Sequence, residues 1–83
     1  MKQKELETLI KTGFVEELTA QVLFSGSKKY WGLYVESERS LPHGWYTFLE
    51  TARGDMRLFA SLDSMYKMLK EIGYEGTLKV AIK

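Results

Sequence analysis

The sequence contains no cysteine, one histidine and one proline among its 83 residues. The absence of cysteine excludes disulfides and thiolate metal sites, so nothing in the sequence requires an oxidising compartment. A single histidine leaves transition-metal binding to carboxylates almost alone, a donor set that suits such ions poorly. We therefore predict no metal ion and no other cofactor.

The sequence also lacks an excess of either charge. Twelve Lys and Arg residues against eleven Asp and Glu residues give a formal net charge of +1. Duplex-DNA binders usually carry a basic excess, because phosphate contacts dominate their affinity. We therefore do not expect the net charge of the molecule to attract it to nucleic acid. A local basic patch is the alternative source of such attraction.

No apolar run approaches the roughly 20 residues of a membrane-spanning helix, and the polar residues 1–5 do not resemble a signal peptide. We expect a cytoplasmic protein that does not associate with membranes. Hydrophobic residues make up 45% of the chain and charged residues 28%, which is typical of a folded domain. The length predicts one domain, residues 1–83, with a single modest core.

Catalytic motifs are missing as well. His43 lies between Pro42 and Gly44, a context typical of a solvated turn. No serine has a histidine partner in a recognisable arrangement, and the glycines do not form a phosphate-binding loop. We predict that the protein is not an enzyme.

The clearest pattern spans residues 45–72 and predicts strand, tight turn, strand and helix. Residues 45–50 and 56–60 are rich in aromatic and β-branched side chains, with the turn residues Arg53-Gly54 between them. The helix that follows has Ser61 as its N-cap. Its apolar stripe comprises Leu62, Met65, Tyr66, Leu69 and Ile72, and Gly73 is placed to end it.

The register of this second hairpin depends on its turn. A two-residue loop at Arg53-Gly54 sets Glu50 opposite Arg57 and pairs two aromatic residues, Phe48 and Phe59. Arg-Gly is a weak signal for such a loop, because its first central residue needs a positive φ. A three-residue loop with Gly54 in the left-handed conformation is the alternative, and it changes the register.

The first half of the chain predicts a short helix over residues 5–11 and a hairpin around Gly26-Ser27. Strand alternation pairs the apolar residues of this hairpin with one another: Leu18 with Val35, Ala20 with Leu33, and Val22 with Trp31. A helix over residues 15–24 is the alternative. Residues 36–43 form a polar loop, and residues 77–82 alternate as a final strand.

These elements predict an α+β fold in the order α-β-β-β-β-α-β. Sequential hairpins favour an antiparallel sheet of four to five strands with the helices packed on it. Both faces of the second hairpin are apolar, with Tyr46, Phe48 and Phe59 on one of them. Because the second helix can cover only one face, the other needs a cover.

Three interpretations of that second face compete. The N-terminal helix can cover it through Leu6, Leu9 and Ile10. It can instead be a surface for self-association or for a protein partner. The third interpretation is single-stranded nucleic-acid binding, because aromatic side chains lie beside cations. The residues that support this interpretation are Lys28, Lys29, Tyr30, Tyr34, Arg53 and Arg57.

Residues 44–54, Gly-Trp-Tyr-Thr-Phe-Leu-Glu-Thr-Ala-Arg-Gly, are followed by residues 57–63, Arg-Leu-Phe-Ala-Ser-Leu-Asp. This part of the chain resembles small accessory proteins carried on bacterial plasmids and other mobile elements. The resemblance covers roughly the second half of the chain and contains no active-site motif. It implies a cytoplasmic bacterial protein with regulatory or maintenance duties, often in contact with DNA or with a DNA-bound partner.

The sequence therefore predicts a non-catalytic accessory or regulatory binding protein. Its leading partner is single-stranded nucleic acid, held through the six aromatic and basic residues named above. The alternative is a protein-interaction module, a homodimer or a complex with another protein, that uses Tyr46, Phe48 and Phe59.

Overall fold

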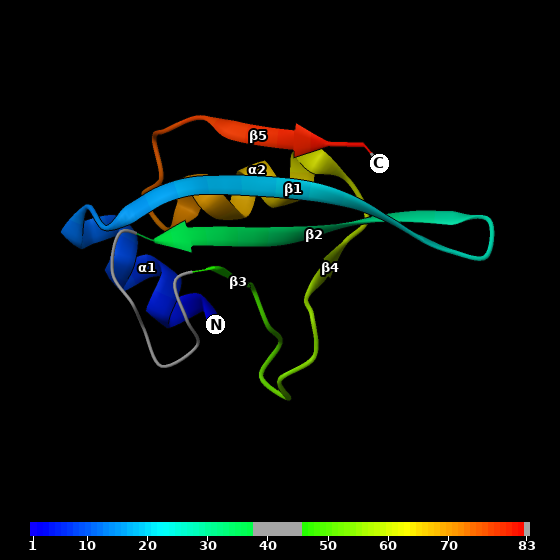
Figure 1. Cartoon of the computed structure of the whole chain (residues 1–83), viewed down its shortest axis with the longest axis horizontal. Coiled ribbons are helices and arrows are strands. Elements are labelled where there is room, and N and C mark those ends of the chain that lie inside the picture. Colours follow the sequence, from blue (N-terminus) through cyan, green and yellow to red (C-terminus); the bar gives the residue numbers. More distant parts are fainter. Residues whose placement is uncertain (38–45, 83) are drawn as a thin grey trace.

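The computed structural model describes residues 1–37 and 46–82. The predicted polar loop at residues 36–43 and the start of the strand at Trp45 lie largely outside the described residues. The elements along the chain are α1 (Gln3–Thr12), β1 (Val15–Ser25), β2 (Lys28–Ser37), β3 (Tyr46–Phe48), β4 (Leu58–Phe59), α2 (Leu62–Glu71) and β5 (Leu78–Ala81) (Figure 1). This is the predicted α+β order.

The first hairpin has the predicted register. β1 and β2 are antiparallel, with Leu18 opposite Val35, Ala20 opposite Leu33 and Val22 opposite Trp31. The alternative of a helix over residues 15–24 is wrong. Gly26 has φ +64°, and no other residue of this turn has a positive φ, as the predicted turn type requires.

The sheet is mixed, whereas the sequence predicted a purely antiparallel one. The strand order is β3-β2-β1-β5, and β5 runs parallel to β1, with Leu18 opposite Leu78. β4 also pairs with β2 and runs antiparallel to it. Because α2 carries the chain back across the sheet after β4, the next strand takes the direction of β4, which is also that of β1.

β3 and β4 do not form the predicted hairpin with each other. Both pair with β2 along the same edge, where Phe48 lies opposite Tyr34 and Phe59 lies opposite Trp31. Residues 50–57 leave the sheet between them and project away from it, at the bottom of Figure 1. We call this segment the excursion.

The excursion closes on the three-residue loop that was the alternative. Glu50 forms a bridge with Met56, and the N–H group of Thr51 donates to the carbonyl of Asp55 over 2.7 Å. Gly54 has φ +94°, a conformation that Arg53 avoids. The predicted two-residue register, with Glu50 opposite Arg57, is therefore wrong.

The helix ends follow the sequence signals. The hydroxyl of Ser61 accepts a hydrogen bond from the N–H group of Ser64 over 3.1 Å, which caps α2. Gly73, with φ +93°, ends α2, and Gly13, with φ +78°, ends α1. Buried positions on α2 are Met65, Met68 and Leu69, followed by the buried Ile72 just after its end, whereas the predicted Tyr66 is half-exposed.

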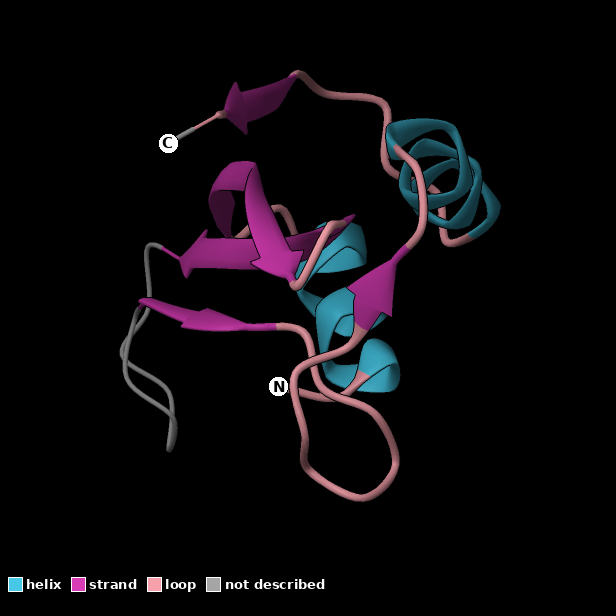
Figure 2. Cartoon of the chain, turned by 90° about the vertical axis from the view of Figure 1, so that its right-hand side faces the viewer, coloured by secondary structure: helices cyan, strands magenta, loops and turns pink. Residues whose placement is uncertain are grey.

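Both helices pack on the same face of the sheet (Figure 2), which we call the inner face. Leu6 and Leu9 of α1 join a single core with the buried residues of α2 and with the inner-face side chains of β1 and β2. The interpretation that the N-terminal helix covers the second face is therefore wrong. No helix within residues 1–37 and 46–82 is long and apolar enough to cross a membrane.

Candidate functional site

Aromatic rings gather on the face of the sheet that is turned away from both helices, which we call the outer face. Tyr34 and Tyr46 stack with their ring centroids 5.7 Å apart and their planes 13° apart. Phe48 meets Tyr34 edge to face, with centroids 6.2 Å apart. We call Tyr34, Tyr46 and Phe48 the ring cluster.

Strand pairing explains how the ring cluster forms. Phe48 lies directly opposite Tyr34, and Tyr46 lies opposite Glu36, diagonally across from the same tyrosine. Alternation along β2 keeps Tyr34 off the inner face, where Leu33 and Val35 are buried. Tyr46 remains 59% exposed, so this cluster presents ring surface to solvent.

A glycine in β2 shapes the outer face beside the ring cluster. A Cβ added at Gly32 would lie 2.7 Å from the sulfur of Met56 and 3.1 Å from a methyl group of Leu23. Met56 of the excursion therefore lies over Gly32, in space that any other residue would fill. Leu58, opposite Gly32, is half-exposed and extends this apolar area.

The charges of the outer face nearly balance. Alternation places Lys28 there at the hairpin end, and Lys79 there on β5, opposite Thr19. Glu17 and Glu36 face each other across β1 and β2 on the same side of the sheet. The outer face is therefore aromatic and only weakly charged.

The predicted basic residues are not brought together. Lys29 lies on the inner side, with its ammonium 5.6 Å from the centroid of the Trp31 ring. Arg57 stacks over Phe59 at 4.8 Å, and Arg53 is exposed in the loop of the excursion. Of the six residues predicted to bind nucleic acid, three share the outer face: Lys28, Tyr30 and Tyr34.

The three residues predicted as a protein interface are divided as well. Tyr46 and Phe48 lie on the outer face, but Phe59 is 5% exposed and belongs to the core. The prediction that they share one face is wrong. Phe48 lies opposite Tyr34 and Phe59 lies opposite Trp31, and these two β2 residues point to opposite faces of the sheet. A direct Phe48–Phe59 pair would have kept them together.

Sequence reasoning missed two contributors to the outer face. Lys79 was placed on a final strand, but its side of the sheet depends on the pairing of β5 with β1, which no local pattern reveals. Met56 reaches the outer face only because the excursion folds over Gly32. The one available signal was Gly32 itself. A glycine inside a predicted strand often marks a place where another part of the chain or a ligand comes close to the strand backbone.

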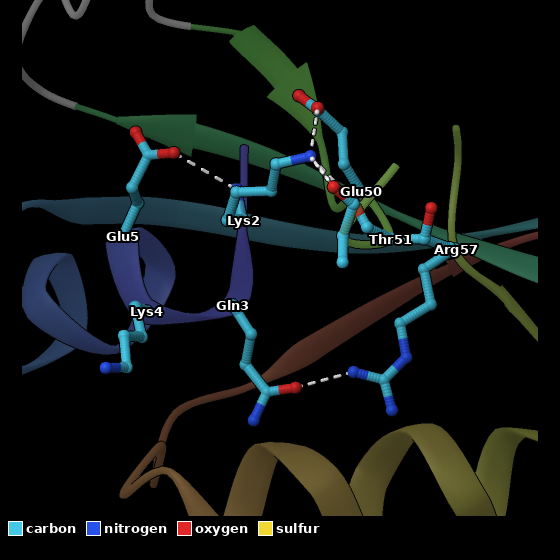
Figure 3. Close-up of a pocket in the computed structure, with 8 residues that line it drawn as sticks. Lys2, Gln3, Lys4, Glu5, Glu50, Thr51 and Arg57 are labelled. Carbon is cyan, nitrogen blue, oxygen red and sulfur yellow. Dashed lines mark hydrogen bonds and ion pairs between the residues drawn. The ribbon is translucent and has the colours of Figure 1, made fainter. Parts of the chain in front are cut away.

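A hollow of about 750 Å³ lies between the start of α1 and the excursion (Figure 3). Hydrogen bonds cross it between the start of α1 and the excursion. The ammonium of Lys2 donates to the carbonyl of Thr51 over 2.7 Å, and Arg57 donates to the amide oxygen of Gln3 over 2.5 Å. These bonds link the excursion to α1, so we assign this hollow a structural role.

Glu50 is the centre of that link. The ammonium of Met1, which is fully buried, donates to the Glu50 carboxylate and also to the carbonyl of Phe48 over 3.0 Å. The hydrogen bond from Met1 holds the pKa of Glu50 below its ordinary value of 4.5, and Lys2 acts in the same direction. Desolvation of the carboxylate opposes this effect without reversing it.

We expect Glu50→Gln to flatten the acid limb of the stability profile. A carboxyl group whose pKa is lowered in the folded state stabilises the fold above its unfolded pKa, and this contribution is lost as pH falls through the folded value. The difference in unfolding free energy between wild type and Glu50→Gln should thus be largest near neutral pH and shrink below pH 4.5. Urea denaturation at a series of pH values measures it.

Glu7→Gln is the matched control for Glu50→Gln. Glu7 pairs with Lys11 over 3.3 Å on the exposed side of α1, a setting in which an ion pair contributes little. Its profile should follow that of the wild type. A Glu50→Gln difference that stays constant across the acid range would contradict the assigned link.

Comparison with protein-family models, curated proteins and solved structures found no match to this chain. Within residues 1–37 and 46–82, no cluster of His, Asp and Glu side chains could hold a metal ion.

Proposed function

We propose that the protein is a non-catalytic accessory or regulatory binding protein, and that its outer face takes single-stranded nucleic acid. The observation that carries the proposal is the ring cluster on the outer face, with Tyr46 59% exposed. The resemblance to plasmid accessory proteins adds the setting, a bacterial cytoplasm.

Stacking is the physical basis of the proposed binding. Aromatic side chains on a sheet whose other face is covered by helices form a known platform for unpaired bases. Each stacked base contributes about 1–3 kcal/mol, and the stacking depends little on sequence. Tyr30 lies four residues before Tyr34 on β2, so the rings continue along that strand beyond the ring cluster.

The charge distribution sets the expected salt dependence. On a single strand, each phosphate contact contributes a slope of about −0.7 to the logarithm of the association constant against the logarithm of salt concentration. Among residues 1–37 and 46–82, Lys28 and Lys79 are the cations that strand pairing places on the outer face, and two such contacts give a slope of about −1.4. This is shallow, in contrast to the steep dependence of a binder that relies on charge.

Fluorescence anisotropy with a labelled oligothymidylate tests the proposal. We expect Tyr34→Ala and Tyr46→Ala each to weaken binding about tenfold, the equivalent of one lost stacking contact. Tyr66→Ala is the matched control, because Tyr66 is a half-exposed tyrosine on α2, whose helix lies on the inner face. Equal affinity in all three variants, or no binding of wild type at low salt, would refute the proposal.

A protein-interaction module is the second candidate, and the exposed Leu58 beside Met56 favours it. These aliphatic side chains extend the rings into a mixed apolar area of the kind found in protein interfaces. In this case the wild-type chain is dimeric or captures a protein partner, and Tyr46→Lys abolishes the complex. Phe59→Ala would act through the core instead, by lowering stability.

A further inference from the structure

The two edges of the sheet differ in how they are covered. At the β3 edge, the Met1 ammonium donates to the carbonyl of Phe48, and the N–H group of Glu50 donates to the carbonyl of Met1 over 2.7 Å. The excursion projects from the same edge. β5 forms the opposite edge. It pairs with β1 on one side, and no described strand pairs with its other edge.

Exposed apolar side chains gather at the β5 edge. Val80 is 45% exposed, Ile82 is 74% exposed and Phe24 is 70% exposed. Val80 lies opposite Ala20, a buried inner-face residue, so alternation places Val80 and Ile82 on the inner side, beside β1. Phe24 follows Val22 on the same side of β1 and continues this strip. These three are half of the exposed large hydrophobic residues among the described ones.

We propose that two copies of this chain associate through β5, pairing their strands antiparallel about a two-fold axis. An unpaired strand offers a row of N–H and C=O groups that a second strand can satisfy. The two short sheets then become one continuous sheet. The outer faces of both copies lie on the same side of it.

The sequence of β5 selects the register. A two-fold axis perpendicular to the sheet keeps the inner faces of both copies on one side of the joined sheet. Residues that lie opposite each other across the axis must therefore point to the same face. An axis at Lys79 would set two lysines against each other, which is destabilising. An axis at Val80 sets Val80 against its own copy and Leu78 against Ile82, while Lys79 faces Ala81. Apolar residues then meet on the inner side.

The same asymmetry of the edges explains why the partner is a single second copy. Growth into a filament requires two different complementary surfaces on each molecule. The β3 edge is occupied by Met1 and by the excursion, so pairing at β5 closes after one addition. An isologous interface needs only that β5 be complementary to itself, which the Val80 register satisfies.

A single introduced cysteine tests this register, because the chain has none of its own. Residues that face each other across antiparallel strands have Cβ atoms about 4.5–5.5 Å apart, close to the span of a disulfide. Val80→Cys, treated with diamide, should therefore form a covalent dimer. Leu58→Cys is the matched control, since Leu58 is half-exposed at the opposite edge and this variant should form no covalent dimer under the same conditions.

Light scattering of the untreated protein supplies the second arm. Wild type should have twice the 9.6 kDa chain mass, and Val80→Lys should revert to a monomer because it sets two ammonium groups face to face. A monomeric wild type at high concentration, or equal crosslinking of Val80→Cys and Leu58→Cys, would overturn the proposal. A dimer that dissociates in Tyr46→Lys but persists in Val80→Lys would place the interface on the outer face instead.

This test is independent of the one for nucleic-acid binding. Val80→Lys leaves the ring cluster untouched, so its affinity per chain for the oligothymidylate should stay within about twofold of wild type. The dimer can therefore fail while the binding surface stands, and the reverse also holds.

Discussion

Replacing Leu33 with alanine should lower the free energy of unfolding by about 2–5 kcal/mol, the range observed for leucine truncations in well-packed cores. Leu33 is fully buried on β2, a central strand of the sheet. It lies opposite Ala20, whose small side chain cannot expand into the space that the substitution would leave. The backbone is held on the other side, where the Leu33 carbonyl accepts from the N–H group of Leu49 over 2.8 Å.

Leu58→Ala is the matched control for Leu33→Ala. It removes the same atoms from a strand that pairs with β2, but from a half-exposed side chain on the outer face. We expect it to cost less than about 1 kcal/mol. Urea denaturation followed by circular dichroism measures both variants, and similar losses for the two would contradict the placement of the core on the inner face.

Removing residues 50–57 should leave the sheet intact and release α1. Leu49 lies next to Leu33 and Leu58 lies opposite Gly32, so joining them makes β3 and β4 one continuous strand along β2. Eight is an even number, so Phe59 still points to the inner face. The N-terminus then loses the carboxylate of Glu50, and Met1 loses its cover.

We expect this deletion to lower the free energy of unfolding by about 2–5 kcal/mol, comparable to the loss of one buried methionine contact. Hydrogen exchange measures where the loss falls: amides of Gln3–Thr12 should lose protection, and those of Leu62–Glu71 should keep it. Deleting residues 51–57 is the control. Seven is odd, so it turns Phe59 to the outer face and buries Leu58 instead, and we expect that variant not to fold.

Much of the fold follows from local patterns in the sequence. The register of the first hairpin was predictable because two signals agree: the alternation of residues 18–24 and the glycine that opens the turn at Gly26. The limits of α2 were also predictable, because Ser61 and Gly73 each have a specific backbone role. These features depend on neighbours within a few residues.

The remaining topology depends on contacts that local patterns do not encode. The Arg53-Gly54 turn predicted a hairpin, but β2 is the longer partner, and both β3 and β4 pair with it. The direction of β5 follows from the return path of α2. The residues of β3 and β4 do not indicate that both strands pair with β2, and the residues of β5 do not indicate its direction.

The candidate site was predictable to the same extent. Alternation within β2 is enough to put Tyr30 and Tyr34 on one face, and the register of the first hairpin has them there. The cations that lie on the same face as these tyrosines depend on the path of residues 50–57 and on the edge of the sheet that β5 occupies. For this reason Lys79 was missed, and Arg57 was assigned to a surface that it does not share.

The pairing of β1 with β5 also has a kinetic consequence. Leu18 finds Leu78 sixty positions later in the chain, whereas the β1–β2 hairpin closes over a two-residue turn. Hairpins form within about 1–10 μs, but contacts between distant segments slow folding because a long loop must close first. On the ribosome, β1 and β2 can pair while the other edge of β1 still has unpaired backbone groups. These groups find their partners only when β5 emerges.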